Sequence, residues 1–116
     1  MPSTVVPACI NQRLARRLAL LVLDVDGVLT DGGLWYGPRG ETLKRFHVRD
    51  GHGIKLLRAA GVEVAVVSGR KSAAVRTRCR ELGVKLVMQG VTDKGQALDR
   101  LLQRLSLTDT QVACIG

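Results

Sequence analysis

Two aspartates separated by one residue stand at the end of an unusually apolar segment. Residues 18–25 read LALLVLDV, and Asp24 and Asp26 fall at the end of this run. Carboxylates this close together repel each other unless a cation or a shared proton lies between them. A strand-end aspartate that caps a loop would explain one of the two, but not both. The pair therefore indicates a functional site that holds either a bound cation or a shared proton.

Two further segments carry residues suited to binding an anion. Ser68, Gly69 and Arg70 directly follow a second apolar run. A hydroxyl group, backbone N–H groups and a helix start form a cradle for a phosphate, although the same residues also begin helices by plain capping. Lys94 falls in the first turn of the last predicted helix, where a cation opposes the helix dipole. We expect Lys94 to contact a phosphoryl oxygen or the Asp24 carboxylate; the alternative is a solvated surface lysine.

These residues must be positioned by an alternation of strands and helices. Aliphatic runs at 18–25, 62–67, 84–88 and 112–115 are typical of strands buried on both faces of a parallel sheet. Apolar periodicity predicts helices over 53–60, 71–82 and 94–105, the last capped by Thr92 or Asp93. The chain is therefore predicted to be α/β, a Rossmann-like parallel sheet with helices on both faces. Ligands bind such sheets at the carboxyl ends of the strands, where Asp24 and Ser68 fall.

Residues 31–50 interrupt this alternation and predict a β-hairpin flap. Two strand-like pieces, 34–36 and 42–48, flank a four-residue loop at 37–40. The segment holds all the aromatic residues of the chain, Trp35, Tyr36 and Phe46. The helix–sheet core is therefore predicted to contain no aromatic side chain. We expect the hairpin to project and to use its aromatics at a subunit contact; the alternative is a flap packed on its own domain.

Composition restricts the class of protein further. A chain of 116 residues is one domain, and its net charge of +8 is spread evenly, which suits small anionic substrates at least as well as nucleic acid; we expect no nucleic-acid partner. The three cysteines, Cys9, Cys79 and Cys114, show no CxxC spacing, which argues against a zinc site or a disulfide framework. No apolar run is long enough to span a bilayer, and we expect a cytoplasmic protein. Residues 1–17 are predicted to form an N-terminal arm, with one domain over 18–116.

The order of these elements resembles the haloacid dehalogenase-like phosphatases. The first motif of that family, Asp-x-Asp-x-x-x-Thr after strand one, is matched by Asp24, Asp26 and Thr30. Its Ser or Thr after strand two is matched by Ser68, and its Lys at a later helix start by Lys94. Further matching stretches at 48–51, 68–71, 78–79 and 89–90 are similar to the capless subgroup of 3-deoxy-D-manno-octulosonate 8-phosphate phosphatases. This similarity extends over residues 18–116.

The resemblance implies roles for particular residues. Asp24 would be the nucleophile and Asp26 the general acid and base, and both would hold Mg²⁺. Ser68 and Lys94 would bind phosphoryl oxygens. The remaining residues of the implied substrate site are Thr30, Gly69, Arg70, Lys71 and Arg78. Of these, Arg70, Lys71 and Arg78 could reach the carboxylate of a sugar acid, or could equally form a solvated helix face. The subgroup implies a homotetramer whose 31–50 hairpins meet at its centre, a small sugar phosphate as substrate and a role in lipopolysaccharide precursor synthesis.

One motif of the family is absent from this sequence. The fourth motif, Gly-Asp-Asp followed by another Asp, begins after the last strand, and the sequence reaches its final residue at Gly116. We therefore expect a C-terminally incomplete phosphatase domain. Two alternatives stay open: a catalytically inactive oligomerisation module, and a phosphatase-like module associated with a nonulosonate cytidylyltransferase. A phospho-acceptor receiver domain is disfavoured, because receivers place the phosphorylated Asp after a later strand.

Overall fold

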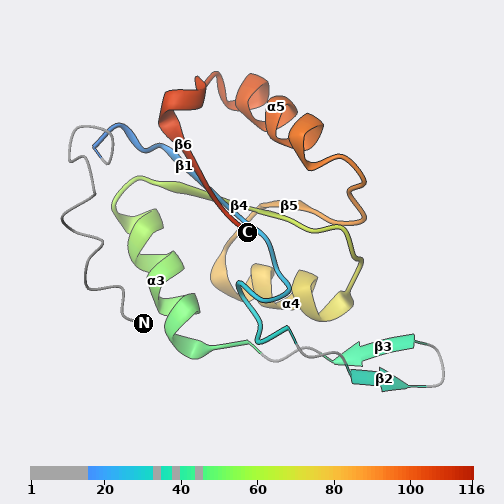
Figure 1. Cartoon of the computed structure of the whole chain (residues 1–116). Helices are drawn as coiled ribbons and strands as arrows, with labels where there is room; N and C mark the ends of the chain where they lie inside the picture. Colours follow the sequence, from blue (N-terminus) through green and yellow to red (C-terminus); the bar gives the residue numbers. More distant parts are fainter. Residues whose placement is uncertain (1–15, 33–34, 38–39, 44–45) are drawn as a thin grey trace, which may run out of the picture.

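A parallel four-stranded sheet forms the centre of the chain (Figure 1). The computed structural model describes residues 16–32, 35–37, 40–43 and 46–116, so the predicted N-terminal arm lies almost wholly outside the described residues. The strands run in the order β5-β4-β1-β6. Their bounds are Leu20–Leu23 for β1, Glu63–Val67 for β4, Leu86–Met88 for β5 and Val112–Ile115 for β6. The predicted parallel sheet is confirmed.

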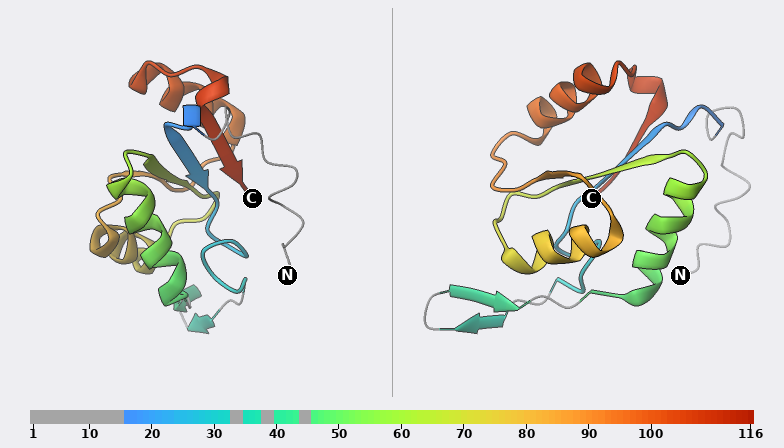
Figure 2. Two further views of the ribbon diagram at one scale, coloured as in Figure 1. Left: turned by 90° about the vertical axis from the view of Figure 1, so that its left-hand side faces the viewer. Right: turned by 180° about the vertical axis from the view of Figure 1, so that it is seen from behind.

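Helices cover both faces of this sheet, as predicted (Figure 2). Side chains of a strand alternate between its two faces. Thus Val64 and Val66 of β4 join the core with α3 (Val48–Ala59) and α4 (Ala73–Leu82), whereas Ala65 and Val67 pack toward α5 (Lys94–Leu105). The two aliphatic cores hold the sheet, and hence the loops at its carboxyl edge, in a fixed frame. In the described part of the chain, no helix has the length and apolar character needed to cross a membrane.

Helix starts differ in how well the sequence locates them. Helix α5 begins at Lys94 as predicted, because the Asp93 carboxylate accepts a hydrogen bond from Gln96 N at 3.0 Å. Helix α4 begins at Ala73, two residues later than predicted, with Ser72 as its cap. Helix α3 begins at Val48, five residues earlier than predicted, because His47 Nδ1 accepts a hydrogen bond from Arg49 N at 3.1 Å. The predicted strand piece 42–48 is therefore wrong at its end.

The hairpin consists of β2 (Trp35–Gly37) and β3 (Gly40–Leu43), which pair antiparallel. It extends away from the sheet at the lower right of Figure 1. Gly37 and Gly40 pair with each other, so the predicted four-residue loop is wrong: both glycines belong to the strands. The positions of the Trp35 and Tyr36 side chains lie outside the described structure.

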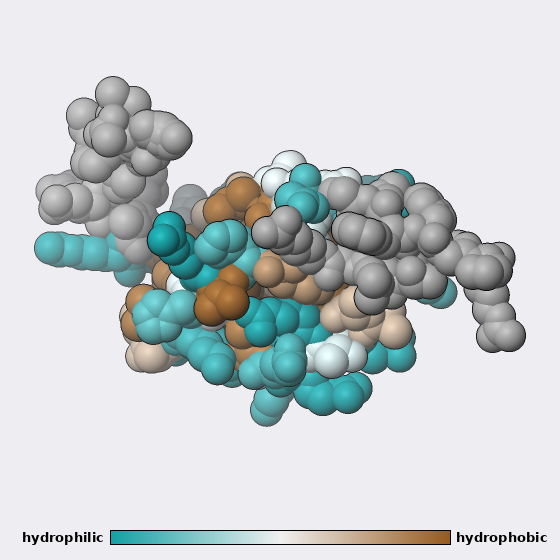
Figure 3. Space-filling view, turned by 90° about the horizontal axis from the view of Figure 1, so that it is seen from below, coloured by the Kyte–Doolittle hydropathy of each residue, from teal (hydrophilic) through white to brown (hydrophobic). Residues whose placement is uncertain are grey.

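Phe46 corrects the prediction that the core contains no aromatic residue. Thr30 and Phe46 form an isolated antiparallel bridge at the base of the hairpin. This bridge turns the Phe46 ring inward, where it is partly buried against the core formed by β1, β4, α3 and α4. Elsewhere, the face seen from below mixes apolar and polar side chains (Figure 3). The large apolar residues most exposed among those described are Val48, Leu56 and Ile115.

Candidate active site

The carboxyl edge of the sheet brings the predicted acidic and cationic residues together. Asp24 directly follows β1, Ser68 directly follows β4, and Lys94 begins α5. Because β1 and β4 are parallel neighbours, the loops that follow them emerge side by side. Asp24 and Asp26 are about three-quarters buried, with 25% and 28% of their side-chain surfaces exposed. A ligand at this edge therefore meets carboxylates that are partly shielded from water.

Asp24 is fixed by its surroundings on several sides. Its backbone N–H donates to the Ile115 carbonyl at 3.0 Å, and its Oδ1 accepts from Val25 N at 2.8 Å. The same Oδ1 lies 3.2 Å from Lys94 Nζ. Gly116 adopts φ +135°, and a Cβ added there would lie 2.5 Å from Asp24 Cβ, so only glycine fits beside this aspartate. Sequence reasoning missed this close approach, which a glycine at the end of a strand could have indicated.

Asp26 lies instead on a tight turn. The Val25 carbonyl accepts N–H groups from Val28, Leu29 and Thr30 at 3.2, 2.9 and 3.1 Å. Asp26 Oδ2 lies 3.5 Å from Arg70 Nε, which belongs to the loop after β4. This contact was not predicted, because the two residues are far apart in sequence.

Thr30 stabilises this turn from within. Its hydroxyl oxygen accepts N–H groups from Gly27 at 3.3 Å and Gly32 at 3.1 Å. The hydroxyl also donates to the Val25 carbonyl at 3.4 Å, and the residue is only 8% exposed. Gly27 and Gly32 both have positive φ, which glycine adopts without strain. The structure thus places Thr30 inside the loop that carries Asp26, where it shapes the turn.

Ser68 anchors the second loop of the site. The residue is 2% exposed, and its Oγ accepts a hydrogen bond from Arg70 N at 3.2 Å. Its backbone donates to Met88 O at 2.8 Å and accepts from Val91 N at 3.0 Å. A hydroxyl that accepts one hydrogen bond can also donate one, so the Ser68 Oγ–H is able to donate to a ligand oxygen. Gly69 lies against the same neighbouring loop, since an added Cβ would lie 3.4 Å from Val91 O.

Gln89 joins the loops after β4 and β5. Its Oε1 accepts from Ser72 N at 2.7 Å, and its Nε2 donates to Ser72 O at 3.2 Å. The resemblance to the phosphatases included Gln89 but gave it no role. The signal that could have indicated one is the place of this polar residue directly after β5. Lys71 lies beside Gly90, where an added Cβ would come within 2.6 Å of Lys71 Cε.

Arg78 is not brought to the acidic pair. It lies on α4, where its Nη1 is 3.6 Å from Glu81 Oε1 and its guanidinium packs over Gly51 of α3. The structure therefore groups most of the predicted site residues at one edge and leaves Arg78 between two helices. The grouped residues are Asp24, Asp26, Ser68, Gly69, Arg70 and Lys94.

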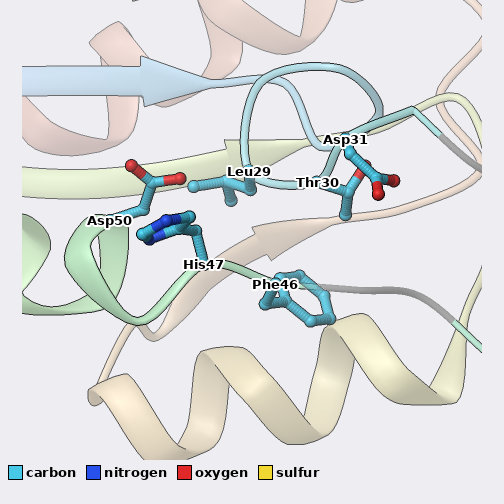
Figure 4. A pocket seen from close by; sticks show the side chains of 6 residues that line it. All are labelled: Leu29, Thr30, Asp31, Phe46, His47 and Asp50. Atoms are coloured by element: carbon cyan, nitrogen blue, oxygen red, sulfur yellow. The ribbon is translucent and has the colours of Figure 1, made fainter.

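Two hollows border this region. A hollow of about 210 Å³ is lined by residues that include Asp24, Lys94, Leu98 and Cys114. A larger one, of about 370 Å³, lies between the turn that ends at Thr30 and Asp31 and the start of α3 (Figure 4). In that view His47 and Asp50 lie together on one side of Leu29, and Asp31 lies on the other side and points away from them. Asp24 and Lys94 line the smaller hollow and not the larger one, whereas Asp26 and Ser68 line neither.

The donor set at this edge fits a magnesium ion held jointly with a ligand. Among the described residues, no group of three or more His, Cys, Asp or Glu side chains is arranged to hold a metal. Mg²⁺ usually keeps several waters and is held by one or two carboxylates together with substrate phosphate oxygens. Asp24 provides such a carboxylate, and the backbone carbonyl of Asp26 on the adjoining turn is a second oxygen donor. They fit Mg²⁺ with a phosphate better than an ion enclosed by protein alone.

Comparison with known proteins points to one family. No family model matches the chain. The chain is 44% identical over 102 residues to 3-deoxy-D-manno-octulosonate 8-phosphate phosphatase KdsC of Escherichia coli K12, covering 88% of this chain and 54% of that protein. It is 46% identical over 105 residues to KdsC of Haemophilus influenzae, covering 90% of this chain and 58% of the relative. The chain thus spans about half the length of the curated relatives it matches.

Solved structures agree. The phosphatase of Moraxella catarrhalis, in complex with magnesium, phosphate and KDO, superposes with a TM-score of 0.85 at 38% identity, over 90% of this chain and 60% of that one. The cobalt-bound enzyme of H. influenzae gives 0.85 at 46% identity, over 89% and 60%. Over about nine-tenths of its length, the chain is similar to KdsC-type members of the haloacid dehalogenase-like phosphatases. Its relatives are phosphomonoesterases, and the resemblance inferred from Asp24, Ser68 and Lys94 is confirmed at the level of family.

Proposed function

We propose that this chain is part of a magnesium-dependent phosphatase that hydrolyses 3-deoxy-D-manno-octulosonate 8-phosphate in the cytoplasm, in lipopolysaccharide precursor synthesis. The observation that carries this proposal is the meeting of Asp24, Lys94 and Ser68 at one edge of the sheet, with Asp26 on the adjoining turn. The names of the relatives and the KDO and phosphate bound to the M. catarrhalis enzyme support the substrate class.

The geometry supports Asp24 as the nucleophile. Its Oδ1 is engaged by Val25 N and Lys94 Nζ, so Oδ2 is the oxygen presented for attack. A bond forms between Asp24 and phosphorus while the bond from phosphorus to the sugar oxygen breaks, giving an aspartyl-phosphate. Asp26 donates a proton to the leaving oxygen, and it later removes a proton from the water that hydrolyses the intermediate. The products are inorganic phosphate and the free sugar acid.

Other residues hold the phosphoryl group. The Ser68 hydroxyl, the backbone beside Gly69 and the Lys94 ammonium present donors to its oxygens, where charge must be balanced throughout transfer. Asp24 and Asp26 would hold Mg²⁺, which when bound offsets the repulsion between the carboxylate and the phosphate. Lys71 lies at the same edge and remains a candidate for the substrate carboxylate. The 31–50 hairpins are proposed to join four copies of the chain into a tetramer.

The second candidate is an inactive module. Among the described residues, no group of three or more His, Cys, Asp or Glu side chains could hold a metal ion unaided, so an experiment must separate this module from an enzyme. The test is phosphate release from the sugar phosphate, with magnesium titration. One sample is this 116-residue chain, and the other is the same chain joined to the C-terminal part of E. coli KdsC that the match does not cover. We expect little turnover from the first and magnesium-dependent turnover from the second. Absence of turnover from both favours the inactive module, whereas equal turnover shows that further acidic residues are dispensable.

A further inference from the structure

We propose that Arg70 is a positioning residue for Asp26: it ties the turn that carries Asp26 to the loop after β4. This inference rests on the proposed function. It replaces the expectation that Arg70 reads a carboxylate of the substrate. The observation behind it is the 3.5 Å separation between Arg70 Nε and Asp26 Oδ2.

The backbone of Arg70 is held on both sides. Its N–H donates to Ser68 Oγ at 3.2 Å, and its carbonyl accepts from Gly90 N at 3.3 Å. The Arg70 side chain therefore starts from a fixed point beside the predicted phosphate cradle. From there its Nε faces Asp26, which belongs to the loop of a different strand. The ion pair thus connects the two loops whose relative position a general acid depends on.

The Arg70–Asp26 ion pair contributes little to the free energy of folding. Arg70 has 49% of its side-chain surface exposed, and ion pairs in such settings contribute roughly 0–1 kcal/mol to folding because water screens them. A general acid, in contrast, must lie within hydrogen-bonding reach of the leaving oxygen, so small displacements have large effects on proton transfer. A weak contact between two loops therefore matters more for geometry than for folding.

The proton balance shows which substrates depend on the position of Asp26. In the first step the O–H bond of Asp26 breaks, a new O–H bond forms at the leaving sugar oxygen, and the phosphorus–oxygen bond to the sugar breaks. The benefit of a well-placed Asp26 appears only where the leaving group needs a proton. A sugar alkoxide needs one, whereas a nitrophenolate leaves without it.

A first experiment measures the turn without depending on turnover. Amide hydrogen exchange of Val28, Leu29 and Thr30 is compared in the 116-residue chain and its Arg70→Gln and Arg70→Lys variants. We expect exchange to quicken about two- to five-fold in Arg70→Gln and less in Arg70→Lys, as befits a half-exposed ion pair. Asp26→Asn should give the same increase, and the double variant no more than either single one. Arg100→Gln, at an exposed position of α5, is the control and should change nothing. Unchanged exchange in Arg70→Gln overturns the tie between the loops.

A second experiment separates positioning from substrate recognition. In the chain extended as above, Arg70→Gln should lower kcat about ten-fold or more for the sugar phosphate and less than about two-fold for p-nitrophenyl phosphate. A rise in KM confined to the carboxylated sugar, with kcat unchanged, would instead show that Arg70 binds the substrate carboxylate. Equal loss on both substrates would show a merely structural role. If the unsubstituted enzyme turns over neither substrate, the proposed function fails, and hydrogen exchange alone decides the role of Arg70.

Discussion

The two aspartates of the site are held in different ways. Asp24 is fixed by the framework: its N–H bonds to β6, its Oδ1 accepts from Val25 N, and Gly116 packs against its Cβ. Asp26 lies on a turn, and its partner Arg70 comes from a separate loop on a half-exposed side chain. The difference matches what each residue is proposed to do. A nucleophile attacks along one direction, whereas a general acid and base must first protonate a sugar oxygen and later remove a proton from a water molecule.

The two cationic side chains, Lys94 and Arg70, differ in the same way. Lys94 starts from the first turn of α5, whose cap at Asp93 fixes its position against the sheet. Arg70 starts from the loop between β4 and α4, which is held by Ser68 and by the loop after β5. We therefore expect loss of the Asp24–Lys94 pair to lower kcat on every substrate. The effect on kcat of losing the Asp26–Arg70 pair should depend on the leaving group of the substrate.

The largest effect is expected for Asp24→Asn. The change removes the attacking oxygen but keeps the size of the side chain, so turnover of the extended chain should fall at least about 1,000-fold. Circular dichroism should show an unchanged fold, and Asp99→Asn on the exposed side of α5 should keep full activity. Retention of activity by Asp24→Asn would contradict an aspartyl-phosphate mechanism.

Lys94→Gln is expected to have the next largest effect. Its ammonium contacts Asp24 and is proposed to stabilise a phosphoryl oxygen, a type of contact whose loss costs about 100- to 1,000-fold in kcat. Unlike Arg70→Gln, the change should affect sugar and nitrophenyl phosphates equally, which kcat values for both substrates will show. Lys85→Gln, at another exposed lysine, is the matched control. A loss restricted to the sugar phosphate would remove the contrast between the two cations.

Residues of the hairpin and its base allow two tests, one of folding stability and one of assembly. Phe46 packs against the core at the base of the hairpin, so Phe46→Ser should lower the free energy of unfolding by about 2–4 kcal/mol in urea denaturation. If Trp35 lies in a subunit contact, Trp35→Ser should shift the protein toward monomer in sedimentation at micromolar concentration. A wild-type protein that is already monomeric contradicts the proposed assembly.

The smallest effect concerns the two cysteines in the described part of the chain. Cys114 is exposed and lines the hollow beside Asp24, whereas Cys79 is buried between α4 and the sheet. Burial raises the pKa of the Cys79 thiol, and the nearby Arg78 charge offsets this only in part. Iodoacetamide should therefore modify Cys114 first at neutral pH, as peptide mass spectrometry will show.

Cys79 also makes a prediction about pH and stability. Because its folded pKa is raised, its contribution to stability is complete below the ordinary thiol pKa and is lost as pH rises through the folded value. Cys79→Ala should reduce this alkaline loss, measured as the change in unfolding free energy with pH. An identical pH dependence in the variant would contradict the shift.

The sequence predicted the framework well and its connections poorly. Aliphatic runs located all four strands of the parallel sheet, because a doubly buried strand requires them. Apolar periodicity and a capping aspartate located α5 to the residue. The start of α3 was missed because an imidazole, a less common cap, begins it. The Arg70–Asp26 pair and the inward Phe46 were missed because each depends on two distant segments meeting, which no local pattern encodes.

The pairing of β1 with β6 also sets an order of events during synthesis. Leu20 of β1 and Val112 of β6 are register partners. Strand β1, which precedes Asp24, therefore pairs with β6 only after the segment between these two strands has left the ribosome. Until then the N–H of Asp24 has no Ile115 carbonyl to bond, and Lys94 has only just been made. The nascent chain can collapse around β1 and β4 first. The carboxylate that we propose as the nucleophile is therefore set in place late, after the scaffold that must hold it.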